Sequence, residues 1–115
     1  MVYANRLDSE IYHSNMSLCY ILYSPILDRF YTGATNDAIE NRISKHNSQY
    51  YGTDKFTAQT NDWEEFITIE SIDFKHALRI EKYIKKMKSK VYIINLKKYP
   101  ELKEKLFINT RDTKI

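Results

Sequence analysis

The sequence predicts a small α+β domain whose elements follow the order β-β-α-β-α-α, with a further helix at the C-terminal end. Two short apolar and aromatic runs, separated by turn-forming residues, predict a β-hairpin early in the chain. Apolar residues at helical spacing predict amphipathic helices in the second half. The length of 115 residues is that of one domain. Two glycines are too few for a glycine-rich phosphate-binding loop.

The chain is expected to divide into three parts. Residues 1–15 show no clean hydrophobic period and are predicted to be an N-terminal extension, with Met16 as an alternative start. Residues 16–98 hold the periodic segments and are expected to form the domain itself. Residues 99–115 are expected to add the C-terminal helix and a tail.

The hairpin is predicted from residues 18–23 and 29–34, which are both rich in apolar and aromatic side chains. Between these runs, Ser24, Pro25 and Asp28 are typical turn residues. The spacing therefore predicts a hairpin with a loop of four or five residues.

The middle of the chain predicts a helix, a loop and a strand. Asp37 and Glu40 have the spacing of an N-cap residue and its N3 partner, which predicts a helix over residues 37–48. Residues 49–62 are polar and aromatic and are predicted to form a loop. Residues 63–71 alternate well enough to predict the third strand.

Three further helices are predicted after this strand. Asp73 is expected to cap a helix over residues 74–88. Ser89 is expected to cap a short helix that runs to about residue 96. Pro100 stands where a terminal helix begins, because proline is favoured in the first helical turn.

Charge is distributed unevenly along the chain, although the net charge is only +3. Residues 1–74 carry five basic and eleven acidic side chains, whereas residues 75–105 carry eleven basic and three acidic ones. Such a basic block is expected of a protein that binds a polyanion. The alternative is a solvated helical surface with no ligand.

Several polar residues fall on apolar helix faces. Glu81 projects into the apolar arc of its helix, where a carboxylate has to be paired, protonated or bound to a cation. An ion pair with Lys85, four residues later, is the structural alternative. Arg42 and His46 are also four apart and share the apolar side of the first helix. Their structural alternative is an arginine that extends to the surface beside a partly buried histidine.

Composition excludes other classes of protein and site. Cys19 is the single cysteine, so the chain forms no internal disulfide and no zinc site built on cysteines. No apolar run approaches the roughly 20 residues that a membrane span requires. The start of the chain shows no secretory signal pattern, so the cytoplasm is the expected location.

Two triplets that contain tyrosine come before the helix with Arg42 and His46. The triplet LCY at residues 18–20 and the triplet YTG at residues 31–33, with ten residues between them, resemble the paired signature of the GIY-YIG nuclease superfamily. Arg42 and His46 follow at the spacing of its helix motif, with the sequence HN starting at the histidine. The stretches KFTAQTNDW and ALRIEKYIKKMKS come next in the expected order. The resemblance covers residues 17–97 and is closest to small single-domain bacterial members.

The resemblance implies a three-stranded antiparallel sheet flanked by helices and metal-dependent hydrolysis of DNA phosphodiester bonds. It places five residues in the active site: Tyr20, Tyr31, Arg42, His46 and Glu81. The carboxylate is implied to hold a single Mg²⁺ or Mn²⁺ ion. This matches the preference of Mg²⁺ for few protein ligands and several waters.

Roles follow from the chemistry that phosphodiester hydrolysis needs. Tyr31 is expected to be the general base, and Tyr20 to orient the water or contact phosphate. Arg42 is expected to donate to the phosphate, and His46 to assist either step. Asn95 lies at a plausible distance from the carboxylate to be the late asparagine of the family.

On the helix face opposite the apolar stripe, Arg79, Lys82 and Lys86 are expected to contact the DNA backbone. The expected function is a DNA endonuclease in repair or processing, which acts on duplex or branched DNA with low sequence specificity. A protein partner could then supply the specificity. The alternatives are a nucleic-acid-binding module with little catalysis of its own, an RNA-directed nuclease, and a lysine-rich interaction domain in which Glu81 is only an ion-pair partner.

Overall fold

The computed structural model describes residues 17–53 and 55–111. The predicted extension over residues 1–15, and Met16, lie outside the described residues. The described elements follow in this order: β1 (Leu18–Ser24), β2 (Arg29–Thr35), α2 (Ile39–Asn47), the 3-10 helix η1 (Phe56–Gln59), β3 (Glu64–Glu70), α3 (Phe74–Met87), α4 (Lys90–Lys98) and α5 (Pro100–Thr110). The predicted α+β class and its order of elements are confirmed, and η1 lies within the segment predicted as a loop.

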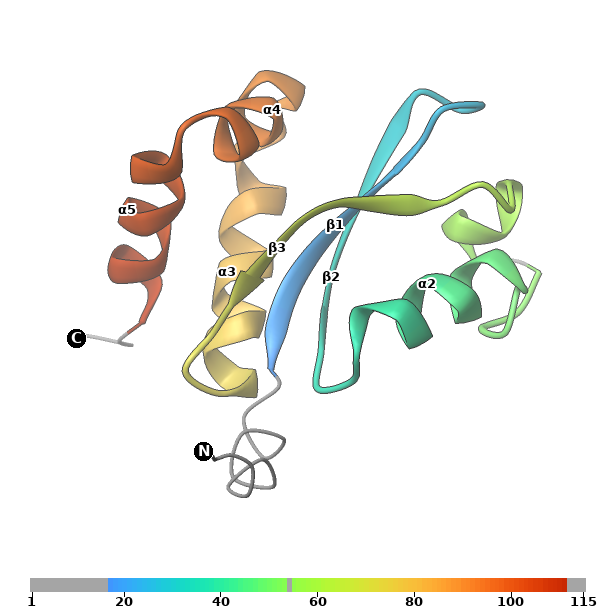
Figure 1. The fold of residues 1–115 in the computed structure, drawn as a ribbon, viewed down its shortest axis with the longest axis horizontal. Helices are drawn as coiled ribbons and strands as arrows, with labels where there is room; N and C mark the ends of the chain where they lie inside the picture. Colours follow the sequence, from blue (N-terminus) through green and yellow to red (C-terminus); the bar gives the residue numbers. More distant parts are fainter. Residues whose placement is uncertain (1–16, 54, 112–115) are drawn as a thin grey trace, which may run out of the picture.

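The three strands form one antiparallel sheet in the order β2-β1-β3 (Figure 1). The predicted hairpin pairs β1 with β2 through a four-residue loop, in which Asp28 has a φ of 53°. Tyr20 on the central strand lies opposite Gly33 on β2 and opposite Thr68 on β3. This register brings the two signature triplets side by side.

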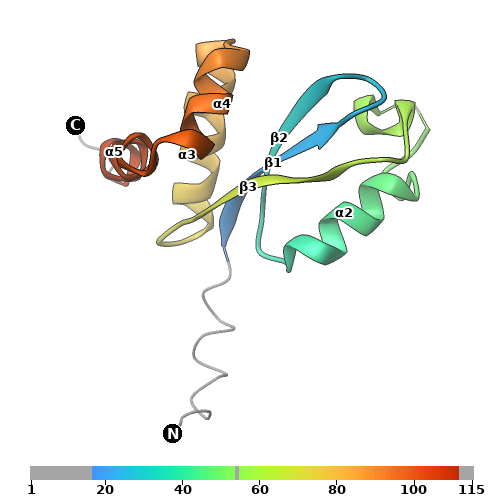
Figure 2. The same cartoon turned by 45° about the horizontal axis from the view of Figure 1, so that its top comes forward.

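The central strand is buried on both faces, because helices cover both faces of the sheet (Figures 1 and 2). Successive side chains of a strand point to opposite faces. Cys19 and Ile21 pack with apolar side chains from α3, α4 and α5, whereas Tyr20 and Leu22 pack with Trp63 and with side chains from α2 and η1. The domain therefore has two cores that meet at β1.

Two of the three predicted helix caps are confirmed. The Asp73 carboxylate accepts from the backbone N–H of His76, and the Ser89 hydroxyl accepts from the N–H of Tyr92. The helix that Ser89 begins runs two residues further than expected, to Lys98.

The cap predicted at Asp37 is wrong. Helix α2 begins one residue later than a cap at this position requires, and its N-cap is Ala38, which has extended backbone. Asp37 Oδ1 instead accepts from the N–H of Ala38 and from the side-chain amide of Asn41, at 2.8 and 3.0 Å. The reason is local, since the Asp37 N–H donates to Thr35 Oγ1 and the carboxylate turns back onto its own neighbour.

Helix α5 is fastened to the end of the core by buried and polar contacts. Leu106 is buried among side chains of α3 and α4. The guanidinium of Arg79 donates to the carbonyl oxygens of Thr110 and Arg111, at 2.7 and 2.6 Å. His76 Nε2 lies 3.1 Å from the hydroxyl of Thr110. In this structure Arg79 therefore holds the C-terminal end of α5.

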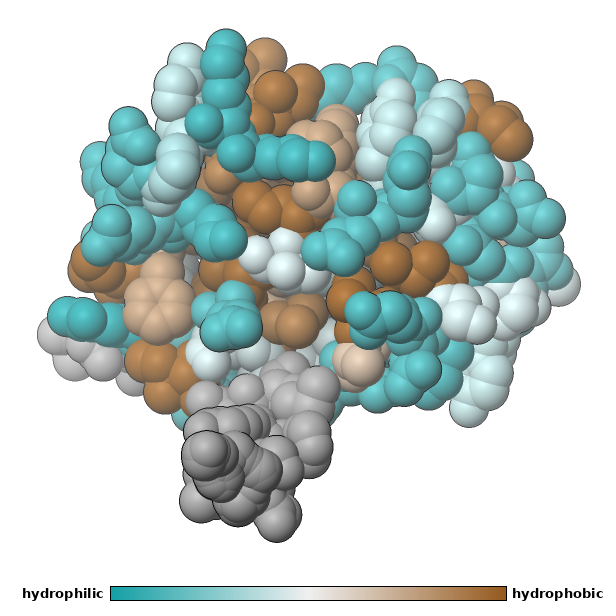
Figure 3. Space-filling view, viewed as in Figure 1, coloured by the Kyte–Doolittle hydropathy of each residue, from teal (hydrophilic) through white to brown (hydrophobic). Residues whose placement is uncertain are grey.

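Hydrophilic side chains cover most of the face in Figure 3, with apolar ones in small groups between them. Lys82 and Lys86 are exposed on α3, as their helix positions predict. Among the described helices, none has the length and apolar character that crossing a membrane requires.

Candidate active site

Three of the five predicted site residues converge on one hydroxyl group. Tyr20 is fully buried, and its Oη accepts from Nη2 and Nε of Arg42 at 3.0 and 3.3 Å. The same oxygen lies 2.9 Å from Nε2 of His46. Because Arg42 and His46 are one helical turn apart, α2 presents both to the central strand at once.

These contacts extend into a chain of hydrogen bonds. His46 Nδ1 lies 2.8 Å from the hydroxyl of Thr57, which is the second residue of η1. Arginine can only donate, and a neutral imidazole carries one donor and one acceptor. One arrangement uses each hydrogen once: Arg42 donates to Tyr20, Tyr20 donates to His46 Nε2, and His46 Nδ1–H donates to Thr57.

The shifted pKa values keep Tyr20 and His46 neutral beside the charged Arg42. Burial raises the pKa of Tyr20 to about 12, although the hydrogen bond from Arg42 opposes the rise. Burial, together with the Arg42 charge, lowers the pKa of His46 to about 4. At neutral pH Tyr20 therefore keeps its proton and His46 remains an uncharged imidazole.

This depressed pKa predicts an acid-sensitive stability. An unfolded histidine has a pKa of about 6.5, so below that value the unfolded chain binds the extra proton and the folded chain does not. We expect this residue to remove about 2 kcal/mol of unfolding free energy as the pH falls from about 7 to about 5. Urea titrations of wild type and His46→Gln at both pH values measure it. The variant should lose less stability than the wild type over this interval, and equal losses would contradict the assignment.

Tyr31 lies beside this chain of hydrogen bonds but takes no part in it. Its half-buried ring is 5.0 Å from the His46 ring and 6.3 Å from the Tyr20 ring, measured between centroids. Within the described part of the chain, no hydrogen bond uses its hydroxyl. Burial raises the pKa of Tyr31, and the charges of Lys85 and Arg42 oppose the rise. Of the two signature tyrosines, Tyr31 is thus the one whose hydroxyl is uncommitted.

Glu81 approaches the site from α3, on the other side of β2. Its side chain is 18% exposed, and Oε2 accepts from Lys85 Nζ at 2.6 Å. The ion pair that the sequence offered as a structural alternative is therefore formed. The same carboxylate lies close enough to Tyr31 to raise the pKa of that phenol. The charge of Glu81 therefore acts on the signature tyrosine as well as on Lys85 of its own helix.

A metal site at Glu81 has to rest on few protein ligands. Across residues 17–53 and 55–111, no three His, Cys, Asp or Glu side chains gather as a metal-binding group. Mg²⁺ is commonly held by one or two carboxylates together with substrate phosphate and water. Glu81, a single partly buried carboxylate, fits that pattern, in which substrate and water would complete the ligand set.

The glycine of the second triplet is required by close approach to Tyr20. A Cβ atom at Gly33 would lie 2.6 Å from both Cζ and Oη of the Tyr20 ring. Real Cβ atoms essentially never approach so closely. The bare backbone at this position therefore gives the Tyr20 hydroxyl the room to reach α2.

This contact predicts the effect of Gly33→Ala. The added methyl should push the ring away from Arg42 and His46, reduce the unfolding free energy by about 1–3 kcal/mol and weaken activity. Thermal unfolding of Gly33→Ala alone and in a Tyr20→Ala background measures the contact. In the background without the ring the substitution should cost far less, and an equal cost in both backgrounds would place the strain elsewhere.

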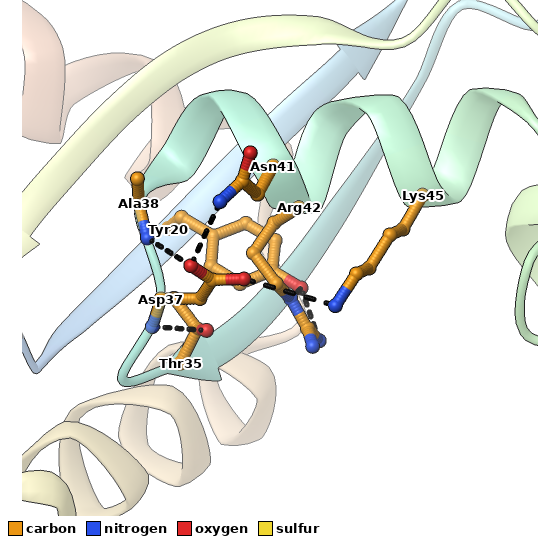
Figure 4. A network of polar contacts seen from close by, with 7 residues as sticks. All are labelled: Tyr20, Thr35, Asp37, Ala38, Asn41, Arg42 and Lys45. Atoms are coloured by element: carbon orange, nitrogen blue, oxygen red, sulfur yellow. Dashed lines mark hydrogen bonds and ion pairs between the residues drawn. The ribbon is translucent and has the colours of Figure 1, made fainter.

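The start of α2 fixes the direction of Arg42 (Figure 4). Asp37 lies at the head of the helix, bonded to Asn41 and 3.7 Å from Lys45 Nζ. Both partners flank Arg42 along the helix, and the guanidinium itself points to the Tyr20 hydroxyl. The Asp37 carboxylate therefore bonds to side chains of its own helix, and the Arg42 guanidinium bonds to Tyr20 instead.

Sequence reasoning missed three residues of the site. A cavity of about 340 Å³ borders Tyr31, Arg42 and His46, and its other walls include Tyr51, Phe56 and Thr57. These three belong to the segment between α2 and β3, which has no hydrophobic period. The available signal was the presence of aromatic residues in an otherwise polar loop.

The HN pair has a second structural role. The side chain of Asn47 donates to the carbonyl oxygen of Trp63 at 2.9 Å and accepts from its N–H at 2.8 Å. The Trp63 indole donates to the carbonyl oxygen of Thr57. The asparagine thus joins the end of α2 to the start of β3 and holds η1 beneath the site.

The predicted DNA contacts lie apart from this centre. Lys82 and Lys86 are exposed on α3 and do not border the cavity, while Arg79 is bonded to the end of α5. Asn95 is partly buried on α4 and also lies outside the cavity wall. The structure therefore brings Tyr20, Tyr31, Arg42 and His46 together. It places Glu81 on α3 within electrostatic range of Tyr31 and leaves the lysines as a separate surface.

Comparison with known proteins gives one match. The family model described as the GIY-YIG catalytic domain matches residues 16–99. No curated protein and no solved structure shows a significant match to the chain. The matched range contains every residue of the site described above.

Proposed function

Because the chain belongs to the GIY-YIG nuclease superfamily, we propose that it is a metal-dependent DNA endonuclease that acts in DNA repair or processing. The observation that carries this proposal is the convergence of Arg42 and His46 on the Tyr20 hydroxyl, with Tyr31 and Glu81 alongside. These are the groups that hydrolysis of a phosphodiester bond needs: an anion clamp, a base and a carboxylate for a cation.

Each side chain of the proposal has a role that its contacts allow. Arg42 has five N–H donors and uses two on Tyr20, so others remain for the oxygens of a phosphate in the cavity. Tyr20 keeps the guanidinium in place and retains its proton. Tyr31, with its uncommitted hydroxyl, acts as the base in its ionised form: once the phenol has lost its own proton, the phenolate accepts the proton of the attacking water.

Glu81 would hold the ion, either Mg²⁺ or Mn²⁺. When bound, such an ion stabilises negative charge on the leaving oxygen and on a non-bridging phosphoryl oxygen. Lys85 shares the carboxylate through Oε2. It also places a positive charge near Tyr31, which opposes the effect of burial on the pKa of that phenol.

DNA binding is proposed to rest on the exposed lysines of α3. Replacing Lys82 and Lys86 together by Ala should weaken binding to all sequences alike and flatten the slope of log K against log[salt] by about one to two units. A matched control is the double replacement of Lys98 and Lys105, which removes the same charge from α4 and α5. Equal slopes for wild type and the α3 variant would move the binding surface elsewhere.

The test of the proposed activity is a cleavage assay on a panel of substrates. Duplex, single-stranded and branched DNA, together with matched RNA, are incubated with the protein in the presence and absence of Mg²⁺. Cleavage of at least one DNA that depends on the ion is the expected result. Cleavage of RNA alone would replace the DNA assignment, and tight binding without any cleavage would favour a binding module.

A further inference from the structure

The cavity beside the catalytic candidates extends beyond what holding a phosphate needs. Its volume of about 340 Å³ lies at the lower end of the range of small-molecule sites. Arg42 and His46 border one side of it. The other walls come from the segment between α2 and β3, chiefly from Tyr51 and Phe56.

Tyr51 packs against Arg42 and His46 in this wall, but its hydroxyl is unused. Its ring lies 4.9 Å from the Arg42 guanidinium carbon and 4.9 Å from the His46 ring, measured to ring centroids. Among the buried side-chain oxygens and nitrogens of the described residues, Tyr51 Oη alone has no hydrogen-bond partner. Buried polar groups are normally paired. Because Tyr51 lines the cavity, a small movement of its ring would bring the unpaired hydroxyl into contact with a ligand there.

The other aromatic walls suit a flat ring. Tyr31 and Phe56 have their ring planes within 18° of each other and their centroids 6.4 Å apart. Phe56 is itself supported by Trp63, 5.9 Å away. Nearly parallel aromatic faces favour a planar π system, and nucleobases stack on such side chains whatever their sequence.

Positive charge at the cavity favours a ligand whose flat ring is attached to an anionic group. Arg42 and Lys55 both border the cavity. Among the described residues that line the cavity, none carries a carboxylate. A planar heteroaromatic ring joined to an anion satisfies the aromatic walls, the cations and the unpaired hydroxyl together. That description fits a nucleotide.

We propose that this cavity receives an unpaired nucleobase next to the phosphate that Arg42 holds, with the Tyr51 hydroxyl bonded to the edge of the base. The proposal rests on the proposed nuclease function and names its substrate class: DNA that contains an unpaired nucleotide. A base inside an intact duplex is stacked and paired, so it enters such a cavity only after it leaves the helix. A bulged base is already unpaired, so most of the free energy needed to move it out of the helix is not required.

The test measures binding, not cleavage. Wild-type protein in EDTA is titrated against two labelled duplexes that differ at one position, where one carries a single bulged nucleotide and the other an abasic residue. The bulged base should bind about fivefold to a hundredfold more tightly, the range that stacking of one base supports. Equal affinity for the two duplexes would overturn the proposal.

Variants assign the preference to the cavity. Tyr51→Phe removes only the unpaired hydroxyl, so it should keep or raise the melting temperature while reducing the preference for the base severalfold. Phe56→Ala should abolish the preference, and thermal unfolding shows whether that variant is folded. Tyr99→Ala removes an exposed ring far from the cavity and should retain the preference. A preference unchanged in Tyr51→Phe would overturn the assignment to this pocket.

The binding test and the cleavage assay can reject their two proposals independently of each other. If DNA is cut but the bulged and abasic duplexes bind equally, the nuclease proposal stands and the base pocket is rejected. If the bulged base is preferred but no substrate is cut, the pocket stands and the catalytic proposal is rejected.

Discussion

Glu81→Gln is expected to abolish cleavage and leave DNA binding intact. The substitution keeps the shape of the side chain and removes the charge that would hold the cation, so the cleavage rate should fall by roughly a hundredfold or more. Affinity for DNA should be unchanged or higher, because one negative charge near the phosphate is gone. Excess Mg²⁺ should restore little. Single-turnover cleavage and binding titrations on one preparation measure both effects.

The ion pair with Lys85 gives the alternative, in which Glu81 has only a structural role, and the same variant tests it. If Glu81 served only that pair, Glu81→Gln would cost a few tenths of a kcal/mol in stability and leave cleavage largely unchanged, since Lys85 is 55% exposed. Glu101→Gln is the matched control, because it removes an exposed carboxylate of α5. Full cleavage by Glu81→Gln would reject the single-metal proposal.

Tyr31→Phe is expected to have the second large effect. The lost hydroxyl is the proposed proton acceptor, and loss of a general base typically costs about a hundredfold to ten-thousandfold in rate. Because the hydroxyl makes no hydrogen bond with the described residues, the unfolding free energy should change little. Single-turnover rates, DNA affinity and thermal unfolding measured together separate a catalytic loss from a folding defect.

Tyr20→Phe is the informative comparison, because this substitution should reduce the unfolding free energy whereas Tyr31→Phe should not. Removing this hydroxyl leaves donors of Arg42 and a ring nitrogen of His46 without their partner. The expected cost is about 1–3 kcal/mol in stability and a smaller loss of rate than Tyr31→Phe shows. If Tyr20→Phe lost more activity at unchanged stability, the roles of the two tyrosines would have to be exchanged.

Local sequence patterns were sufficient for most of the fold. The hairpin was predictable because its turn residues separate two runs of strand-forming side chains, and the caps at Asp73 and Ser89 because each precedes an apolar helical period. The prediction of an N-cap at Asp37 is wrong because the side chain of Thr35 also bonds to the backbone at this point. Thr35 Oγ1 accepts the Asp37 N–H, and the helix begins at Ile39 with Ala38 as its N-cap.

The candidate site was predictable where it sits on regular elements. Arg42 and His46 were found through their helical spacing, and Glu81 through its place among apolar positions. Tyr51 could not be found in this way, because its segment has no period. Its place beside Arg42 depends on tertiary contacts such as the anchoring of Trp63 by Asn47.

The division of the interior by β1 gives the molecule two unequal halves. Among the described residues, seven buried side chains form the core beneath α3, α4 and α5, whereas three form the core beneath α2. Less buried apolar area means a lower free energy of local opening. We therefore expect the half that carries Arg42 and His46 to open first on heating, while the half that carries Glu81 remains folded. Thermal inactivation of this protein would then begin as a reversible loss of phosphate binding, below the temperature at which the whole chain melts.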